Sequence, residues 1–225
     1  NPAPGTKATF LSRDPFSTIM KILGICASHR KSGGTYRLLE EAMKGAKEED
    51  HTIDTRIIEL AGLKISPCIA TCGYDEAIGC AKQPFECNIK DDLQLVFEEM
   101  KQANGILLAS PRYFIVPSKL QALIERLYCA SYWTRWKNPS MLSPLINKPF
   151  GILTTSSSDA YSAIPLQEHL EKFLLWLQMR PVTVKKWPFR GVHGQYPVSE
   201  DTSALELARQ LGREIVTAAR KGTLS

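Results

Sequence analysis

Apolar runs alternate with amphipathic stretches along the chain from Met20 onward. The first run, MKILGICAS (Met20–Ser28), has the continuous apolar character of a strand that is buried on both faces of a parallel sheet. The next stretch, Thr35–Glu49, repeats apolar residues at helical spacing. The alternation continues, and it predicts strands at Ile53–Leu60, Gly105–Ser110, Lys148–Thr155 and Pro181–Trp187 and helices at Asp91–Ala103, Pro117–Ala130, Ile164–Gln178 and Ser199–Gly222.

Strands that alternate with helices predict an α/β fold in which a doubly wound, five-stranded parallel sheet lies between two layers of helices. For five strands, right-handed crossovers favour the order 2-1-3-4-5. Such a sheet binds ligands where the strand order reverses, outside the carboxyl ends of its first and third strands. We therefore expect an N-terminal arm over residues 1–19 and a single domain over residues 20–225, with its ligand site in the loops that follow Ala27, Ala109 and Leu153.

Composition narrows the classes of function. The 225 residues carry a formal net charge of +5, and 44% of them are hydrophobic and 23% charged, as in ordinary globular domains. No long Lys/Arg run accompanies the charge, so we expect no nucleic-acid partner. No stretch of about 18 apolar residues is present, so we expect no membrane span. The first residues lack the pattern of a signal peptide, and we expect a cytoplasmic protein.

The loop after the first strand, SHRKSGGT, has the composition of an anion site. It offers two cations, two glycines and three hydroxyls directly before a helix: Ser28, Arg30, Lys31, Ser32, Gly33, Gly34 and Thr35. Glycines let backbone N–H groups approach an anion, and a helix N-terminus adds unpaired donors and a positive dipole end. We interpret this loop as a phosphate site. A capped turn is the alternative, because Ser and Thr also favour helix N-caps.

The loops after the third and fourth strands complete the predicted site. The first of them combines a Ser-Pro turn with a cation and two aromatic rings, namely Ser110, Pro111, Arg112, Tyr113 and Phe114. Aromatic rings suit contact with a flat ligand ring, whereas a hydrophobic plug beneath a loop is the alternative reading. The second begins with three hydroxyl residues that are expected to line the same crevice, Thr154, Thr155 and Ser156.

Together these loops resemble the flavodoxin-like NAD(P)H-dependent FMN reductases and, among them, the iron-sulfur flavoproteins. The resemblance rests on SHRKSGGT, on SPRYF followed by the helix LQALIER, and on a Pro-Cys segment that ends at Asp91 and Asp92. It implies a three-layer flavodoxin-like fold, FMN as cofactor, and NAD(P)H as electron donor. By resemblance, the loop Ser28–Thr35 holds the FMN phosphate, and Ser110–Phe114 hold the isoalloxazine and the ribityl chain. The fourth-strand loop lacks the Gly-Gly pair that is common in the family.

Four of the six cysteines gather in a cysteine-rich loop over residues 66–92: Cys68, Cys72, Cys80 and Cys87. The resemblance to iron-sulfur flavoproteins implies a [4Fe–4S] cluster on these thiolates, and four thiolates suit such a cluster. The spacing C-x3-C-x7-C-x6-C is wider than the compact run typical of that group. Plain thiols, a disulfide or redox-active pair, and a tetrahedral zinc site stay open as alternatives.

Three functions agree with these patterns. The first is an FMN-dependent oxidoreductase or electron-transfer flavoprotein that relays electrons between FMN and the cluster. The second is a cluster-free NAD(P)H:FMN or quinone reductase, and the third is a non-catalytic, flavin-based redox sensor. The expected partners are small-molecule or protein electron donors and acceptors, and the resemblance implies a homodimer or homotetramer. No side chain stands out as a general acid or base, so we assign no catalytic residue.

Overall fold

The computed structural model describes residues 19–70, 80, 85–137 and 142–222 of the chain. Its strands are β1 (Lys21–Cys26), β2 (Asp54–Glu59), β3 (Gly105–Pro111), β4 (Pro149–Ser156), β5 (Arg180–Pro181) and β6 (Val192–Gln195). Its α-helices are α1 (Gly34–Glu49), α2 (Leu93–Gln102), α3 (Ser118–Lys137), α4 (Ile164–Trp176) and α5 (Thr202–Gly222). Two short 3-10 turns are η1 (Leu60–Gly62) and η3 (Ala160–Ala163).

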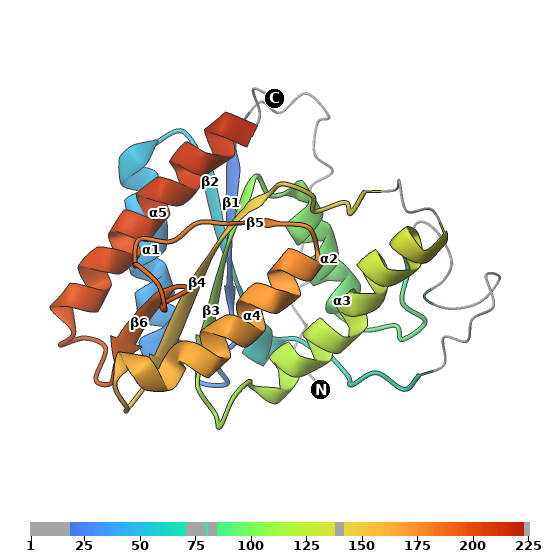
Figure 1. Ribbon diagram of the computed structural model, residues 1–225, viewed down its shortest axis with the longest axis horizontal. Coiled ribbons are helices and arrows are strands. Elements are labelled where there is room, and N and C mark those ends of the chain that lie inside the picture. Colours follow the sequence, from blue (N-terminus) through green and yellow to red (C-terminus); the bar gives the residue numbers. More distant parts are fainter. Residues whose placement is uncertain (1–18, 71–79, 81–84, 138–141, 223–225) are drawn as a thin grey trace, which may run out of the picture.

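The strands form a parallel sheet with the order β2-β1-β3-β4-β5 between two layers of helices (Figure 1). Helices α1 and α5 cover one face, and α2, α3 and α4 cover the other. Strands β1 and β3 are buried along their whole length, because helices cover both faces of the sheet. The predicted α/β flavodoxin-like fold and its strand order 2-1-3-4-5 are confirmed.

The fifth position in the sheet departs from the prediction. The prediction of one strand over Pro181–Trp187 is wrong, because Arg180–Pro181 pairs with the start of β4, the chain then leaves the sheet, and β6 pairs with the end of β4. Val182 and Val184 pack against the core without forming a strand, which explains the alternating apolar pattern. In the described residues the sheet therefore has six strands, two of which share its fifth position.

The layer of α1 and α5 is closed by contact between the two backbones. A Cβ atom on Gly212 would lie 1.8 Å from the carbonyl oxygen of Ala42. A Cβ atom on Gly45 would lie 2.0 Å from the carbonyl oxygen of Arg209. No side chain fits at either position, so the two glycines allow the helices to cross this closely.

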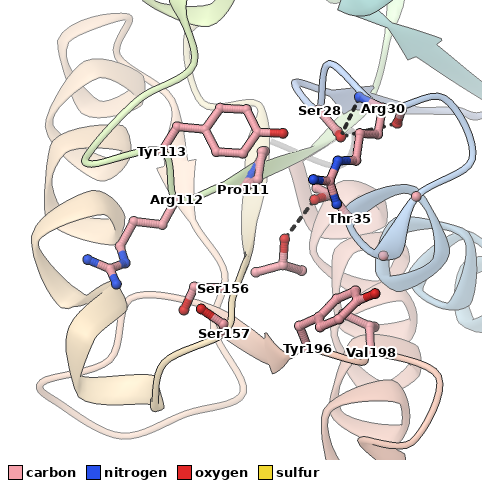
Figure 2. A pocket seen from close by; sticks show the side chains of 13 residues that line it. Ser28, Arg30, Thr35, Pro111, Arg112, Tyr113, Ser156, Ser157, Tyr196 and Val198 are labelled. Carbon is pink, nitrogen blue, oxygen red and sulfur yellow. Dashed lines mark hydrogen bonds between the residues drawn. The ribbon is translucent and has the colours of Figure 1, made fainter.

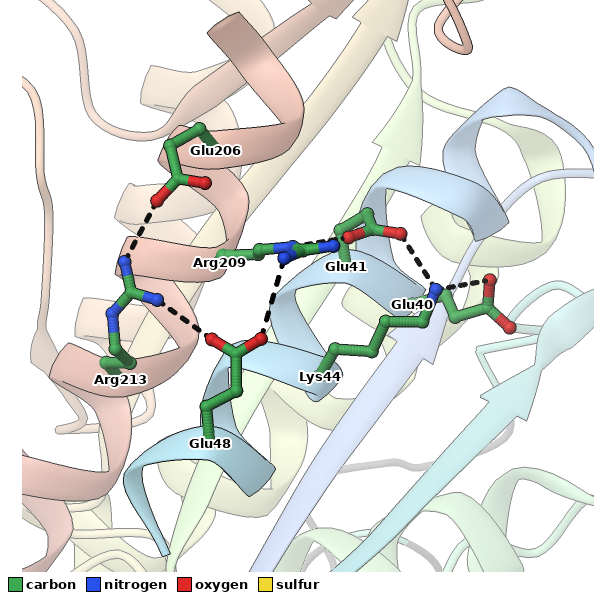
Figure 3. Close-up of polar contacts among 7 residues, drawn as sticks. All are labelled: Glu40, Glu41, Lys44, Glu48, Glu206, Arg209 and Arg213. Carbon is green, nitrogen blue, oxygen red and sulfur yellow. Dashed lines mark hydrogen bonds and ion pairs between the residues drawn. The ribbon is translucent and has the colours of Figure 1, made fainter. Parts of the chain in front are cut away.

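Ion pairs span the solvent side of the same two helices (Figure 3). Arg209 of α5 pairs with Glu41 of α1 at 2.7 Å, and Arg213 pairs with Glu48 at 2.9 Å. A hydrogen bond from Lys44, followed by one from Arg209, lowers the pKa of Glu41 despite its burial. The arginine side chains are 35% to 40% exposed, so water and salt screen these pairs. Packing therefore holds this layer together more than charge does.

The layer of α2, α3 and α4 is built around a larger apolar cluster. Phe97, Leu123 and Leu170 contribute to it from the three helices. Cys80 and Cys87 of the cysteine-rich loop belong to the same cluster. The loop is therefore partly folded into the core rather than laid over the surface.

Within the described residues, no helix combines the length and the apolar character that a membrane crossing requires. The N-terminal arm predicted for residues 1–19 lies outside the described residues except for its last residue.

Candidate functional site

A cavity of about 370 Å³ opens at the carboxyl ends of β1, β3 and β4 (Figure 2). The loops after these strands and the segment after β6 supply its lining: Ser28, Arg30, Gly33, Gly34, Thr35, Pro111, Arg112, Tyr113, Thr155, Ser156, Ser157, Tyr196 and Val198. The strand order reverses between β1 and β3, so the cavity lies where a doubly wound sheet is expected to bind its ligand.

The loop between β1 and α1 brings backbone donors to the cavity. Ser28 Oγ accepts a hydrogen bond from the backbone N–H of Arg30 at 3.0 Å. Ser32 takes a left-handed conformation with φ 51°. The N-cap residue of α1 is Gly33, which has no side chain that could bond to the N–H groups of the first turn. Gly33 and Thr35 line the cavity, which places the positive end of α1 beside it.

Hydrogen bonds join the three strand-end loops into one wall. Thr35 Oγ1 and Thr155 Oγ1 lie 2.6 Å apart, which links the first loop to the third. The backbone N–H of Arg112 donates to the carbonyl oxygen of Thr155 at 2.8 Å. Arg112 Nη2 donates to Ser158 Oγ at 3.0 Å, which links the second loop to the third. These hydrogen bonds hold the walls of the cavity relative to one another.

Only the middle of the predicted second loop faces the cavity. Tyr113 lines it and packs against the His29 ring, with ring centroids 5.6 Å apart. Phe114 is 92% exposed and does not line the cavity. Ser110 is fully buried, and its hydroxyl donates to the carbonyl oxygen of Pro111 at 3.0 Å. Ser110 therefore shapes the turn rather than the cavity surface.

A buried network behind the third loop was not predicted from the sequence. Gln167 Nε2 donates to Thr154 Oγ1 at 3.1 Å, and Thr154 Oγ1 lies 3.2 Å from His193 Nδ1. His193 Nε2 lies 3.1 Å from the carbonyl oxygen of Ser158, so Nε2 carries the proton and Nδ1 accepts from Thr154. Burial lowers the pKa of His193, which favours the neutral form of the ring. Thr154 therefore connects the start of the third loop to Gln167 and His193 and does not face the cavity.

Most of the predicted cofactor-binding residues line the cavity. Those that do not are Lys31, Ser32, Ser110, Phe114 and Thr154. The predicted loop Ser28–Thr35 includes Gly34, but the prediction missed three other lining residues, Ser157, Tyr196 and Val198. Ser157 follows the predicted Ser156, so extending that loop by one residue would have found it. Of the missed residues, two remain that no neighbouring prediction reaches. The last two follow β6, and no motif in the sequence places that segment at the cavity.

The lining suits an anionic ligand that offers hydrogen-bond acceptors. It contains two arginines, Arg30 and Arg112, and the described lining contains no carboxylate. Arg112 Nε is buried and has no hydrogen-bond partner in the described part of the chain. A buried donor without a partner is costly, and an acceptor on a ligand would relieve that cost. The phosphate and carbonyl groups of FMN match these donors, so the residues present fit FMN.

Two of the four predicted metal ligands meet in the core. Cys80 and Cys87 are both buried, and contact with the Cys80 thiol, together with burial, raises the pKa of Cys87. Cys68 is exposed, and Cys72 lies outside the described residues. The described cysteines form no disulfide with one another. Across the ranges that the structure describes, no three potential metal-ligating side chains gather, so the metal site stays a prediction.

A buried arginine contacts one of these sulfurs. Arg126 of α3 is 1% exposed, and its Nε and Nη2 donate to Cys87 Sγ at 3.4 and 3.3 Å. Its Nη1 donates to Asp91 Oδ2 at 2.7 Å and to the carbonyl oxygen of Ser66 at 3.1 Å. Burial acts to raise the pKa of Asp91, but the bonds from Arg126 and Ser66 outweigh it and lower the pKa. Arg126 therefore ties both ends of the cysteine-rich loop to α3.

The chain is similar to a known protein family and to several curated proteins. Residues 20–194 match the family model of NADPH-dependent FMN reductases. The chain is 38% identical over 110 residues to an iron-sulfur flavoprotein of Methanocaldococcus jannaschii, covering 48% of this chain and 51% of that protein. It is 28% identical over 210 residues to an iron-sulfur flavoprotein of Archaeoglobus fulgidus, covering 89% of this chain and 96% of that protein. The alignments with the first curated relatives span about half of their length.

A solved structure shares the fold. RosB, which holds 8-demethyl-8-formylriboflavin-5′-phosphate, matches with a TM-score of 0.65 and 15% identity over 92% of this chain and 81% of that chain. At this level of identity the match shows the fold alone. The family model, by contrast, covers well over half of the chain. The chain therefore belongs to the NADPH-dependent FMN reductase family.

Proposed function

We propose that this chain is an FMN-dependent oxidoreductase and that the cavity at the ends of β1, β3 and β4 binds FMN. The observation that carries the proposal is the lining, which combines two arginines, several hydroxyls and the first turn of α1, with no carboxylate among its described residues. Such a surface favours a phosphate ester over a neutral or cationic ligand. Membership of the FMN reductase family supports the same ligand.

The proposal gives each strand-end loop a task. The loop Ser28–Thr35 holds the phosphate, with Arg30 as its cation and the first turn of α1 as its backbone donors. Pro111–Tyr113, with Thr155 and Ser156 opposite, hold the isoalloxazine and the ribityl chain. FMN, when bound, supplies hydride and single-electron transfer. The chain binds the cofactor, orients it between fixed loops and limits the access of water to it.

The donor, the acceptor and the assembly belong to the same proposal. NAD(P)H is the electron donor that the family description suggests. The acceptor is a small molecule or a protein, and the active form is a homodimer or homotetramer. Light scattering on the eluting protein measures the assembly directly, and a monomeric mass would contradict that part of the proposal.

Two measurements test the proposed activity. The absorption spectrum of the purified protein, with identification of the released cofactor, is expected to show FMN. Steady-state oxidation of NADPH and NADH in the presence of a quinone or free FMN is expected to depend on that cofactor. Failure to bind FMN would contradict the proposal. Binding of FMN without oxidation of NAD(P)H would replace it with the redox-sensor function.

The buried sulfurs favour a more specific function, in which FMN exchanges electrons with a [4Fe–4S] cluster. Cys68, Cys72, Cys80 and Cys87 would hold the cluster, which supplies one-electron transfer when bound. The support is the contact between the buried Cys80 and Cys87 and the two N–H donors of Arg126 on Cys87 Sγ. Hydrogen bonds to a ligating sulfur are a known means of setting the potential of such clusters. Two of the four proposed ligands, Cys80 and Cys87, thus lie together in the core.

Metal analysis of anaerobically purified protein tests this second function. We expect iron and acid-labile sulfide in equal amounts, close to about four of each per chain at full loading. Cys87→Ser is expected to lose them, whereas Cys129→Ser, on α3 outside the loop, is the matched control. Zinc without sulfide would indicate a structural zinc site. Protein without any metal, but with FMN, would leave the cluster-free reductase.

A further inference from the structure

The segment after β6 forms a fourth wall of the cavity. We call Gln195–Asp201 the strap, because it leads from β6 to α5. The backbone N–H of Tyr196 donates to the carbonyl oxygen of Ser156 at 2.8 Å, which ties the strap to the third loop. The backbone N–H of Gln195 donates to Asp201 Oδ2 at 2.9 Å, and the other carboxylate oxygen of Asp201 caps α5. The strap is therefore fixed at both ends.

The strap also lies on the first turn of α1. Val198 is 2% exposed, and a Cβ atom on Gly34 would lie 2.9 Å from Val198 Cγ2. Gly34 is the first residue of α1, where backbone donors and the positive helix end favour an anion. Figure 2 shows Tyr196 and Val198 on the same side of the cavity as Arg30. Tyr196 is therefore held at the end of the cavity that best suits a phosphate.

The side chain of Tyr196 differs from other exposed tyrosines of the molecule. Its side chain lines the cavity and is 63% exposed. Tyr113, in contrast, packs against His29, and Tyr161 packs against Phe189. Tyr196 thus combines a fixed backbone with an exposed hydroxyl at the cavity wall. Tyrosine also orders at low entropic cost, because it has few rotatable bonds.

We propose that Tyr196 is a phosphate-binding residue, and that its hydroxyl donates a hydrogen bond to the phosphate of FMN. The inference rests on the proposed function, and it adds a residue outside the segment that the family model matches, residues 20–194. Arg30, the first turn of α1 and the strap then give the phosphate donors from three segments of the chain. A hydrogen bond to a charged phosphate is stronger than one to a neutral acceptor.

The test compares FMN with riboflavin, which lacks the phosphate. Tyr196→Phe removes the hydroxyl and keeps the ring. We expect the dissociation constant for FMN to rise about tenfold, equivalent to about 1.4 kcal/mol, while that for riboflavin stays unchanged. Tyr161→Phe is the matched control, because Tyr161 is 68% exposed and does not line the cavity. Circular dichroism of each variant checks that the fold is kept.

The possible results separate the inference from the proposed function. If the wild-type chain binds FMN and Tyr196→Phe binds it equally well, the inference is wrong and the FMN site stands. If Tyr196→Phe weakens FMN and riboflavin by the same factor, the hydroxyl does not contact the phosphate, and the inference is again wrong. If the wild-type chain binds no FMN, the proposed function fails, and the inference fails with it.

Discussion

The two helical layers cover the same sheet but are stabilised in different ways. Between α1 and α5, Gly45 and Gly212 bring two backbones together, and the arginines of the ion pairs lie at the surface. In the layer of α2, α3 and α4, a fully buried arginine contacts Cys87. The first layer shows that this fold closes a face of the sheet with packing and screened charges. The second layer, in contrast, holds a buried charge, Arg126, beside two buried cysteines, Cys80 and Cys87.

The largest expected effect comes from removing the buried cation. Arg126→Met leaves Asp91, whose side chain is 6% exposed, without its charged partner. Breaking a buried ion pair from one side costs about 3–5 kcal/mol of unfolding free energy. Urea unfolding followed by circular dichroism measures the loss. The control in the other layer is Arg209→Met, since Arg209 is 40% exposed and a much smaller change is expected. Equal losses in the two variants would contradict the distinction between the layers.

The next effect tests the packing between α1 and α5. Gly212→Ala places a Cβ atom 1.8 Å from the carbonyl oxygen of Ala42, so the helices must move apart. We expect a loss of about 1–3 kcal/mol in unfolding free energy. Gly62→Ala is the control, because no neighbouring atom lies within 4 Å of its added Cβ, and it is expected to change stability by less than about 0.5 kcal/mol. If Gly212→Ala is as stable as Gly62→Ala, close backbone contact does not hold this layer.

The smallest effect compares one carboxylate from each layer in acid. The pKa values of Asp91 and Glu41 are both lowered in the fold. A lowered pKa stabilises the fold above the unfolded pKa, near about 4, and this stability is lost as the pH falls through the folded pKa. We expect Asp91→Asn to flatten the acid slope of urea midpoints more than Glu41→Gln, because the Asp91 partner is buried and less screened. If Glu41→Gln flattens the acid slope more than Asp91→Asn does, the difference in screening between the two layers is contradicted.

Much of the scaffold could be predicted because its central strands are buried on both faces. β1, β3 and β4 appear in the sequence as short apolar runs, and their predicted bounds lie within two residues of those observed. The fifth strand could not be predicted in the same way. Val182 and Val184 alternate with polar residues because they pack on the core from outside the ladder. An alternating apolar pattern indicates which side chains are buried. Here Val182 and Val184 are partly buried without belonging to a paired strand.

The site was predictable where a motif follows a strand and not where distant segments return to it. The loop Ser28–Thr35 could be found because glycines, hydroxyls and cations precede a helix. Tyr196 reaches the cavity through its backbone bond to Ser156 and the packing of Val198 on Gly34, and neither contact can be read from sequence spacing. Arg126 was likewise missed, because no motif in α3 marks it and it gains its contacts from the cysteine-rich loop.

The central claim, that the cavity binds FMN through its phosphate, is tested most directly by titrating the flavin-free chain with FMN and following flavin fluorescence. Arg30 lines the cavity, whereas its neighbour Lys31 does not. We predict saturable quenching at one FMN per chain. We also predict that Arg30→Met weakens binding by about tenfold or more and that Lys31→Met has little effect, because a hydrogen bond to a charged group contributes about 1.5–3 kcal/mol. Absence of saturable binding, or equal behaviour of the two variants, would contradict the account.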